Sequence, residues 1–371
     1  IRSFVAAQRI NPFVPAEQIF TARVSLPDGK GERYESADAR RRFHESLQAR
    51  LAVIPGVTSA VLASDLPGLG AQTRELEIEG RPAADPKQPP RAAVVFATSN
   101  YGSAIGLPLL SGRALNETDG EAGRESAVVT RAFAVRHWPD EVQPLGRRFR
   151  FLRDGKPAEW IAVVGVCGDI VQETLERDAP PVVYLSNRQE PWAWLGLLLR
   201  TPGDPATLAG AVRAAVQEID GDLPLFEVRT LPDAIEHRNW FLGVFGTLFF
   251  TFALIALLMA SIGLYAVVAQ STARRTREIG IRMALGATAG RMVRLVLSRG
   301  VAQLGVGLVL GLGGAFAATR LMDGMLGLVS PADPLVFGSV IALLAGIGVF
   351  ACWLPARRAA QVAPTEALRS E

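Results

Sequence analysis

The stretch from Asn239 to Ala273 reads NWFLGVFGTLFFTFALIALLMASIGLYAVVAQSTA and contains no charged side chain in 35 positions. Because an α-helix rises about 1.5 Å per residue, about 20 residues cross a hydrocarbon layer about 30 Å thick. Two further uncharged runs follow, Gly300–Thr319 with 20 residues and Pro334–Ala356 with 23. Apolar helices buried in soluble domains are usually shorter, about 14 residues, and keep one polar face. The pattern predicts three transmembrane helices, near residues 241–269, 300–319 and 335–354.

Arginines between the runs indicate the orientation of the chain, since cytoplasmic loops retain Lys and Arg close to a span. The loop between the first two runs carries one acid, Glu278, and seven arginines: Arg274, Arg275, Arg277, Arg282, Arg291, Arg294 and Arg299. The segment between the second and third runs holds one arginine and two aspartates, whereas the C-terminal tail holds three arginines. We therefore expect the Arg-rich loop and the C-terminus inside the cell, and residues 1–237 outside.

Residues 1–237 are long enough for a globular unit with its own core. Apolar runs separated by turn signals predict strands at 19–26, 57–63, 76–78, 92–97, 126–130, 160–166, 182–185 and 195–200. A helix is predicted at 36–54, and a second one after Asp204-Pro205. The apolar face of the second helix comprises Leu208, Val212, Ala215, Val216 and Ile219. The order resembles a βαβ or split βαβ unit, and we expect an α+β extracytoplasmic domain of two subdomains.

The connection from this domain to the first span is predicted to be one continuous helix. Thr230 and Asp233 form a start that resembles a capping box, and no helix breaker follows before Trp240. Trp240 and Trp353 lie near span ends, where an amphipathic ring favours the headgroup layer. A rigid connection is suited to carry motion between the two regions, although continuous helices without such a role are common.

Composition argues against several classes of partner. The net charge is only +3, and no nucleic-acid-binding motif is present, so a nucleic acid is not an expected partner. Cys167 in the outer region and Cys352 in the third run are too far apart to pair, and we expect Cys167 to be a buried small hydrophobe. The first residues show no signal-peptide pattern, so we expect an upstream span before Ile1.

Catalytic and metal-binding patterns are absent from the sequence. His44, His137 and His237 are scattered, no serine lies in a GxSxG turn, and there is no GxxxxGK[ST] loop. The glycines of VVGVCGDI (163–170) lack the GxGxxG spacing, so we interpret this segment as a strand that ends in a turn. The spans contain no Asp, Glu, Lys or His, which argues against a proton relay. Any energy source must then come from another polypeptide.

The Arg-rich loop, residues 274–294, carries the most distinctive polar pattern. Arg274, Glu278 and Arg282 recur every four residues, so one helix face presents an acid between two arginines. Ile279 and Met283 form a neighbouring apolar stripe. A short amphipathic helix of this kind at the inner surface is suited to lie on lipid or to insert its stripe into a groove of a cytoplasmic partner.

Four segments resemble one family. RTREIGIRMALGA (275–287) and the ending WLPARRAAQVAPTEALRSE (353–371) look like the FtsX-like permease domain of type VII ABC transporters. VVGVCGDIVQETLERDAPPVVYLS (163–186) and GVTSAVLASDLPG (56–68) are similar to the MacB-type periplasmic core domain. The resemblance covers nearly the whole chain, with the core domain at 1–237 and the permease domain at 238–371. It is closest to the C-terminal half of the duplicated ADOP permeases.

The resemblance implies a non-catalytic permease subunit in the bacterial inner membrane, with four spans per unit, of which the first is missing here. A separate cytoplasmic ABC ATPase would bind ATP and Mg²⁺, so no cofactor or metal is expected in this chain. Hydrolysis inside would move the domain outside, a mechanotransmission that serves efflux or export. Further implied partners are the lipid bilayer, a second permease half or a second copy, and a membrane-fusion or other cell-envelope protein.

The same resemblance assigns the contact with the ATPase, the family's coupling helix. It corresponds here to Arg277, Glu278, Ile279, Gly280, Ile281, Arg282, Met283 and Gly286. Separately, Gly307 and Gly311 form a GxxxG pair in the second run, a spacing that lets helix backbones approach closely. Glycine is also common in spans that have no such contact.

Two other functions remain open. In the first, the chain is a regulatory or sensor module whose outer domain binds or activates a cell-envelope partner such as a hydrolase. In the second, it is a membrane-anchored enzyme, which would need a catalytic cluster in the outer domain that the sequence does not show.

Overall fold

The computed structural model describes residues 14–81, 89–139, 144–153, 155–173, 180–273, 281, 285, 287–321, 338, 341–350 and 353. The chain divides into two compact units, Ile1–Trp240 and Phe241–Glu371. Each unit is described by itself. We call the first unit the ectodomain.

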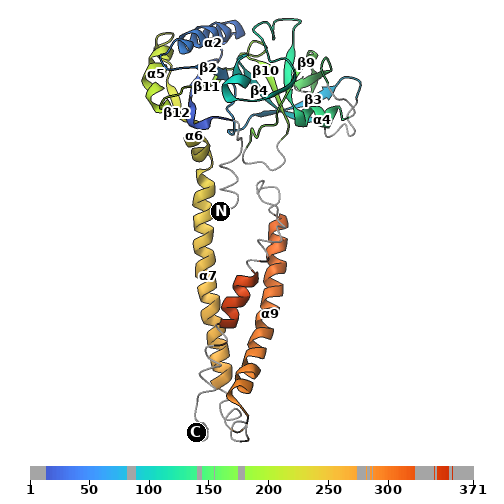
Figure 1. Cartoon of the computed structure of the whole chain (residues 1–371), viewed down its shortest axis with the longest axis vertical. Helices are drawn as coiled ribbons and strands as arrows, with labels where there is room; N and C mark the ends of the chain where they lie inside the picture. Colours follow the sequence, from blue (N-terminus) through green and yellow to red (C-terminus); the bar gives the residue numbers. More distant parts are fainter. Residues whose placement is uncertain are drawn as a thin grey trace. The chain divides into compact units, whose positions relative to one another are not determined.

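A four-stranded antiparallel sheet forms one half of the ectodomain (Figure 1). Its strand order is β2 (Ser59–Ala63), β11 (Trp194–Arg200), β1 (Ile19–Ser25) and β12 (Leu225–Thr230). The turn η1 (Ala16–Gln18) precedes β1, and α2 (Ala37–Ala52) connects β1 to β2. Since β11 lies between β1 and β2, this is a split βαβ unit, as predicted. The turn η2 (Pro205–Leu208) leads into α5 (Ala209–Gln217), which contacts α2.

Capping and alternation explain these elements. The Ser36 hydroxyl accepts a hydrogen bond from the Ala39 amide at 3.2 Å, and the Asp204 carboxylate accepts one from the Ala206 amide at 2.9 Å, so α2 and the 3₁₀ helix η2 that leads into α5 each start at a side-chain cap. Alternate strand residues point at the two helices, because successive side chains of a strand face opposite sides. The resulting core joins Phe20, Ala22 and Val24 of β1 with Phe43, Leu47 and Leu51 of α2 and Val212 and Val216 of α5.

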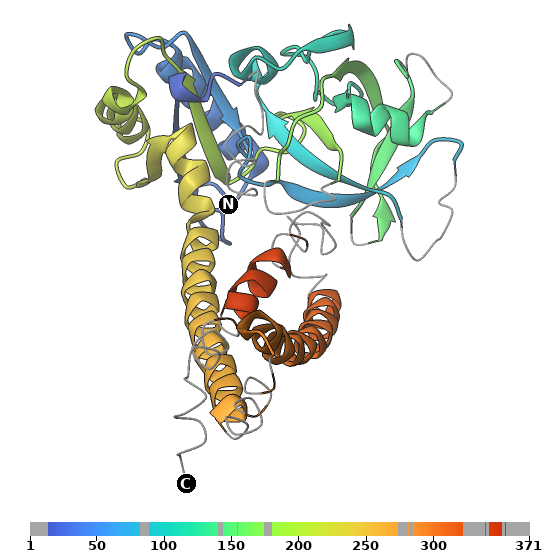
Figure 2. The same cartoon turned by 60° about the horizontal axis from the view of Figure 1, so that its bottom comes forward.

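Six strands inserted between β2 and β11 close into a barrel (Figure 2). They pair in the order β4 (Arg91–Ala97), β3 (Gln72–Ile78), β7 (Arg148–Arg153), β9 (Ile161–Cys167), β6 (Ser126–Thr130) and β10 (Val182–Ser186). β10 then pairs with β4 in parallel and completes the ring. β5 (Leu109–Gly112) pairs with β9, and β8 (Lys156–Pro157) pairs with β7. Two short helices, α3 (Tyr101–Ile105) and α4 (Arg131–His137), accompany the barrel. The α+β prediction is confirmed.

Barrel residues alternate between two cores. Ala92, Val94 and Phe96 of β4 belong to a cluster to which all six strands contribute, which is the barrel interior. The alternate residues of β4, Ala93, Val95 and Ala97, belong to a second cluster. It also contains Ile19, Val61 and Leu198 of the four-stranded sheet. We call this second cluster the seam. Within the described residues a single ladder pair, Ala63↔Ala97, connects the sheet to the barrel, so side-chain packing in the seam carries most of the attachment.

The helix that leaves the ectodomain is interrupted, so the prediction of one continuous helix is wrong. α6 (Leu231–Arg238) ends at Asn239, and α7 (Trp240–Ala273) begins at the next residue. Asn239 has φ −93° and ψ 3°, and its amide donates to both the Ile235 and Glu236 carbonyls at 3.1 Å. Shared hydrogen bonds of this kind mark a tightened helix end, and asparagine has low helix propensity.

The second unit contains α7, α9 (Ala289–Leu321) and the helix Ile341–Phe350. In the described residues one helical stretch, Gly243–Val267, is long and apolar enough to cross a membrane. The apolar helices Leu304–Ala317 and Ile341–Phe350 are shorter. The first predicted span therefore coincides with a suitable helix, whereas the count of three spans stays a prediction.

Cys167 is a buried hydrophobe, as predicted. Its side chain is 2 % exposed, its thiol donates to the Val129 carbonyl at 3.4 Å, and burial raises its pKa to about 12. A thiol with this pKa is not a nucleophile at neutral pH. Cys352 lies outside the described residues.

Gly165 provides a test of the packing between β5 and β9. A Cβ atom at Gly165 would collide with the Arg113 carbonyl oxygen, which is backbone and has little freedom to move. Gly165→Ala should therefore lower the free energy of unfolding by about 3 kcal/mol, measured by urea unfolding with tryptophan fluorescence. Gly102→Ala is the control, because Gly102 lies in α3 with no atom near its virtual Cβ. Equal stability of the two variants would contradict the close approach.

His44 provides a test of pH dependence. It is 3 % exposed in α2, its Nε2 lies 2.9 Å from the Trp192 carbonyl oxygen, and burial lowers its pKa to about 4. Between pH 6.5 and 4, His44 is protonated in the unfolded chain but stays neutral in the folded one. Its contribution to the free energy of unfolding is therefore fully present above pH 6.5 and is lost as the pH falls below that value. The loss is about 3 kcal/mol at most.

The comparison is between wild type and His44→Gln, which keeps a donor for the Trp192 carbonyl but does not titrate. Urea unfolding at pH 7.5 and pH 4.5 should show a smaller loss of stability for the variant. His137, whose pKa burial also lowers to about 4, remains in both proteins and cancels in the comparison. An identical loss in the two proteins would show that His44 can accept its proton in the folded state.

Candidate functional site

Most of the predicted coupling helix lies outside the described residues: Arg277, Glu278, Ile279, Gly280, Arg282, Met283 and Gly286. Ile281 and Leu285 are described, and the Leu285 amide donates to the Ile281 carbonyl at 3.0 Å, the bond of a helical turn. Both side chains are exposed, Leu285 to 82 %. The sequence analysis did not single out Leu285, although its spacing of four from Ile281 places the two on one helix face.

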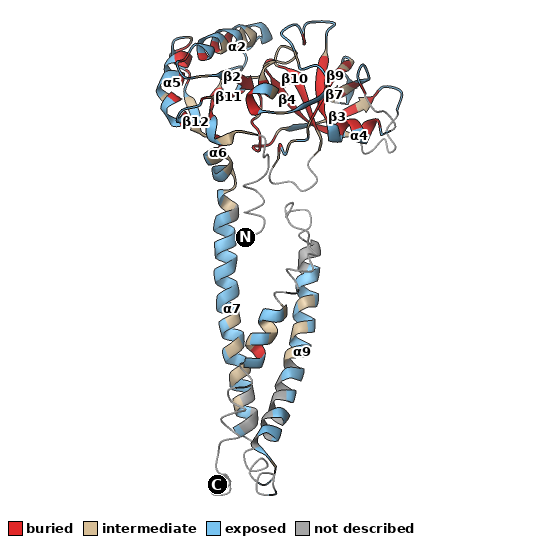
Figure 3. Ribbon diagram, viewed as in Figure 1, coloured by how far each residue is buried: buried red, intermediate tan, exposed pale blue. Residues whose placement is uncertain are grey.

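The surface of α7 is apolar on all sides. Figure 3 shows the helix mostly in the colour of exposed residues, and no residue of its most apolar window is buried. Phe249, Phe250 and Met259 are each more than 60 % exposed. Soluble proteins rarely leave an apolar surface of this size in water, so lipid or other helices must cover it.

The GxxxG glycines face open space in this chain. A Cβ atom at Gly307 or Gly311 would meet no described atom within 4 Å. Gly348 behaves differently, since its virtual Cβ would lie 2.6 Å from a methyl group of Leu304 on α9. Gly348 is therefore the glycine that allows a close helix contact within the described part of this unit, and packing through Gly307 and Gly311 stays a prediction.

The root of the membrane helix is built from α6. The Thr230 hydroxyl accepts from the Asp233 amide at 3.4 Å and donates to the Asp233 carboxylate at 2.7 Å, which caps the helix. Leu231 is 1 % exposed in the seam, and Arg238, two residues before α7 begins, donates to Glu173 at 2.7 Å. The chain thus leaves the ectodomain from a helix that is fixed at both ends.

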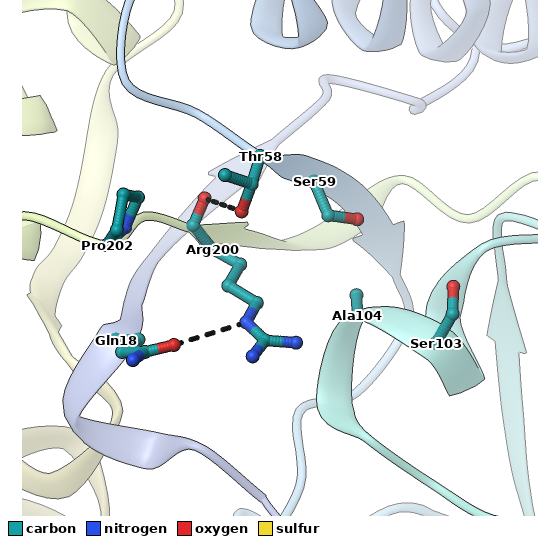
Figure 4. A pocket seen from close by; sticks show the side chains of 7 residues that line it. All are labelled: Gln18, Thr58, Ser59, Ser103, Ala104, Arg200 and Pro202. Atoms are coloured by element: carbon teal, nitrogen blue, oxygen red, sulfur yellow. Dashed lines mark hydrogen bonds between the residues drawn. The ribbon is translucent and has the colours of Figure 1, made fainter.

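A shallow hollow of about 470 Å³ opens beside the first residues of β1 (Figure 4). The Arg200 guanidinium points into it, between Gln18 and Ser103, and its Nε donates to Gln18 Oε1 at 3.3 Å. The Thr58 hydroxyl donates to the Arg200 carbonyl at 3.1 Å. None of the seven described lining residues is acidic, so the hollow favours an anionic group over a cation.

Catalytic chemistry finds no support in the described residues. They contain no group of three or more His, Cys, Asp and Glu side chains that could hold a metal ion. His44 and His137 belong to different helices, α2 and α4, and both are buried, whereas His237 is exposed on α6. The three histidines do not form one site.

Comparison with known families matches both parts of the chain. Residues 8–217 match the model of the MacB-like periplasmic core domain, and residues 250–364 match that of the FtsX-like permease C-terminal region. The first match alone covers more than half of the chain. The two matches lie on opposite sides of the boundary between the two compact units.

Curated relatives agree with these matches. The chain is 26 % identical over 283 residues to the uncharacterized ABC transporter permease YknZ of Bacillus subtilis, covering 76 % of this chain and 70 % of YknZ. It is 30 % identical over 280 residues to the macrolide export ATP-binding/permease protein MacB of Rhodospirillum rubrum, covering 73 % of this chain and 42 % of MacB. The chain thus spans less than half the length of MacB.

A solved structure, the periplasmic region of MacB from Actinobacillus actinomycetemcomitans, aligns with 62 % of this chain and 97 % of its own length. Its TM-score is 0.39 and its identity 15 %, so the family assignment rests on the sequence matches. On those matches, this chain belongs to the family of FtsX-like ABC transporter permeases that carry a MacB-like periplasmic core domain.

Proposed function

We propose that this chain is a permease subunit in which ATP hydrolysis by a separate cytoplasmic ATPase moves the extracytoplasmic domain for efflux or export. Family membership supports a transport role in the bacterial inner membrane and an ABC ATPase as partner. The observation that carries the mechanical part is the short connection between ectodomain and membrane helix, since Asn239 alone separates α6 from α7. Force on α7 then reaches the ectodomain without passing through a flexible linker.

The proposed topology has the ectodomain outside, and the Arg-rich loop and the C-terminus inside. Seven arginines between the first two apolar runs support this orientation. The assembly would contain a second permease half or a second copy of this chain, whose helices would cover part of the apolar surface of α7. A membrane-fusion or other cell-envelope protein would complete the path outside.

The proposed contact with the ATPase is the segment from Arg277 to Gly286, with Glu278 between two arginines. The exposed Ile281 and Leu285 add an apolar pair on one face of the same segment. An amphipathic helix with such a face is suited to dock in a groove of a partner. ATP and Mg²⁺ would bind to that partner and not to this chain.

The hollow at Arg200 supports a second candidate, a regulatory or sensor module. A guanidinium that points into a hollow without acidic lining is a plausible receptor group for an anionic signal or a cell-envelope partner. Gene context separates the two candidates: a neighbouring hydrolase or sensor kinase favours regulation, and a neighbouring membrane-fusion protein favours efflux.

Cysteine labelling tests the topology. Val53→Cys, on a side chain 78 % exposed, and Leu285→Cys, on one 82 % exposed, should react from opposite sides of the membrane. In intact spheroplasts a membrane-impermeant maleimide should label the first variant fully, and the second only after permeabilisation. Wild type controls for the native cysteines. Labelling of both variants in intact spheroplasts would contradict the proposed orientation.

Charge reversal tests the ATPase contact. Glu278→Lys places three positive charges on one helix face, and like charges at an interface cost several kcal/mol. In proteoliposomes that contain the chain and its ATPase, the nucleotide-dependent signal of a fluorophore on Val53→Cys should weaken about tenfold or more. ATP hydrolysis should continue.

Thr288→Lys is the control, because it introduces the same side chain, lysine, at an exposed position just beyond the predicted contact. It should leave the signal unchanged. A full signal in Glu278→Lys would remove the proposed contact from this segment.

A further inference from the structure

Two barrel loops meet beside α6. Residues 66–70 lie between β2 and β3, and residues 172–173 follow β9. The Gln172 amide group donates to the Leu66 and Gly70 carbonyls, each at 2.8 Å, and the Gly70 amide donates to the Gln172 carbonyl at 2.8 Å. Leu69 and Glu173 form a β-bridge. We call these two joined segments the strap. Gln172 is 2 % exposed, so the strap is a fixed part of the barrel half.

Arg238 of α6 binds the strap. Its Nη2 donates to Glu173 Oε2 at 2.7 Å, and the two side chains are 34 % and 18 % exposed. Gly70 makes room for the pair, since a Cβ there would lie 2.8 Å from Glu173 Oε2 and 2.9 Å from Arg238 Nη2. The φ of Gly70 is +93°, which other residues rarely adopt. Removing one partner of a partly buried ion pair costs more free energy than removing one partner of an exposed pair, because the remaining charge is only partly hydrated.

A second arginine, from the four-stranded sheet, lies beside the segment that precedes the strap. Arg23 of β1 is 8 % exposed, its Nε donates to Glu227 of β12 at 3.1 Å, and its Nη1 lies 3.5 Å from the Ser64 carbonyl oxygen. Burial raises the pKa of the neighbouring Asp65, while Arg23 and Arg238 oppose that shift. One arginine from the sheet and one from α6 thus act on the carboxyl group of Asp65, one residue before the strap.

These contacts give α6 two attachments. It follows β12 in the chain, contacts β1, β12 and η1, and packs through Leu231, Ala234 and Ile235 into the seam. Its last turn is held by Glu173, which belongs to the barrel half. α6 is therefore a further connection between sheet and barrel, beside the ladder pair Ala63↔Ala97 and the packing of the seam.

We infer that Arg238 and Glu173 are positioning residues that fasten the root of α7 to the barrel, so that a displacement of the membrane helix moves sheet and barrel together. The mechanical role of this tie rests on the proposed function. The tie itself is a property of this chain alone. It can therefore be tested without the ATPase or nucleotide.

The test measures the distance between α6 and the barrel by electron paramagnetic resonance in the full chain in lipid nanodiscs. Spin labels are attached to Glu236→Cys on α6 and Val135→Cys on α4, both at exposed positions, in a Cys352→Ala background. Cys167 is buried and remains unlabelled. The parent should give one narrow distance distribution. Arg238→Gln and Glu173→Gln should each broaden it, with loss of the single narrow maximum.

A double-mutant comparison separates the tie from general destabilisation. If the two side chains act on each other, the double variant should broaden the distribution no further than either single variant. The control is Arg150→Gln with Glu77→Gln, which removes a 2.8 Å ion pair between β7 and β3 that has no part in α6. The control should keep the narrow distribution.

An unchanged distribution in Arg238→Gln and Glu173→Gln, or a double variant broader than both, would overturn the tie. That result would leave the permease function untouched, because the function is tested by Glu278→Lys and by labelling. Conversely, loss of the narrow distribution in both single variants would support the tie even if the contact with the ATPase lay elsewhere in the chain.

Discussion

The need to keep α7 out of water constrains the rest of this molecule. Its 34 residues are almost entirely apolar, and most of its described side chains are exposed within the chain. At about 25 cal/mol per Å² of apolar surface, contact with water along such a helix would cost more than a domain of this size can offset. The helix must lie in lipid or among other spans. In the proposed topology the ectodomain and the Arg-rich loop lie in water on opposite sides of the membrane.

The ectodomain is built so that one short helix joins all its parts to that span. β4 sends alternate side chains to the barrel interior and to the seam, which allows one strand to serve two cores. α6 occupies the seam and ends at Arg238, two residues before Trp240. α6 therefore contacts both the sheet and the barrel half. Under the proposed function, this is the route by which the membrane helix would act on the whole ectodomain.

Local sequence patterns predicted the elements that have strong local signals. The split βαβ unit, the apolar face of α5 and the strands of the seam follow from alternation and capping. β7, with the sequence RFRFLR, was not predicted although its polar and apolar residues alternate, because three arginines in six residues are also typical of an exposed loop. β12 is an edge strand with few buried residues, which gives it no apolar run. The role of Gly165 was also missed, since its close approach to Arg113 depends on a partner strand far away in the chain.

Long-range polar pairs could not be predicted from the sequence for a similar reason. Arg238 and Glu173 are 65 residues apart, and nothing in either local pattern indicates the other. The helix break at Asn239 shows the opposite failure, since one asparagine of low helix propensity was read as compatible with a continuous helix. The coupling segment was found from its charge pattern and its resemblance to a family, and it remains a prediction for most of its residues.

Hydrogen exchange of the α6 amides in the full chain tests the central claim most directly. If α6 is fixed between sheet and barrel, the amides of its last turn should exchange slowly, at rates close to those of β1 and β4. ATP turnover in the assembled transporter should then alter α6 and the strap together. Exchange of α6 as fast as that of an exposed helix, independent of the strap, would contradict the account.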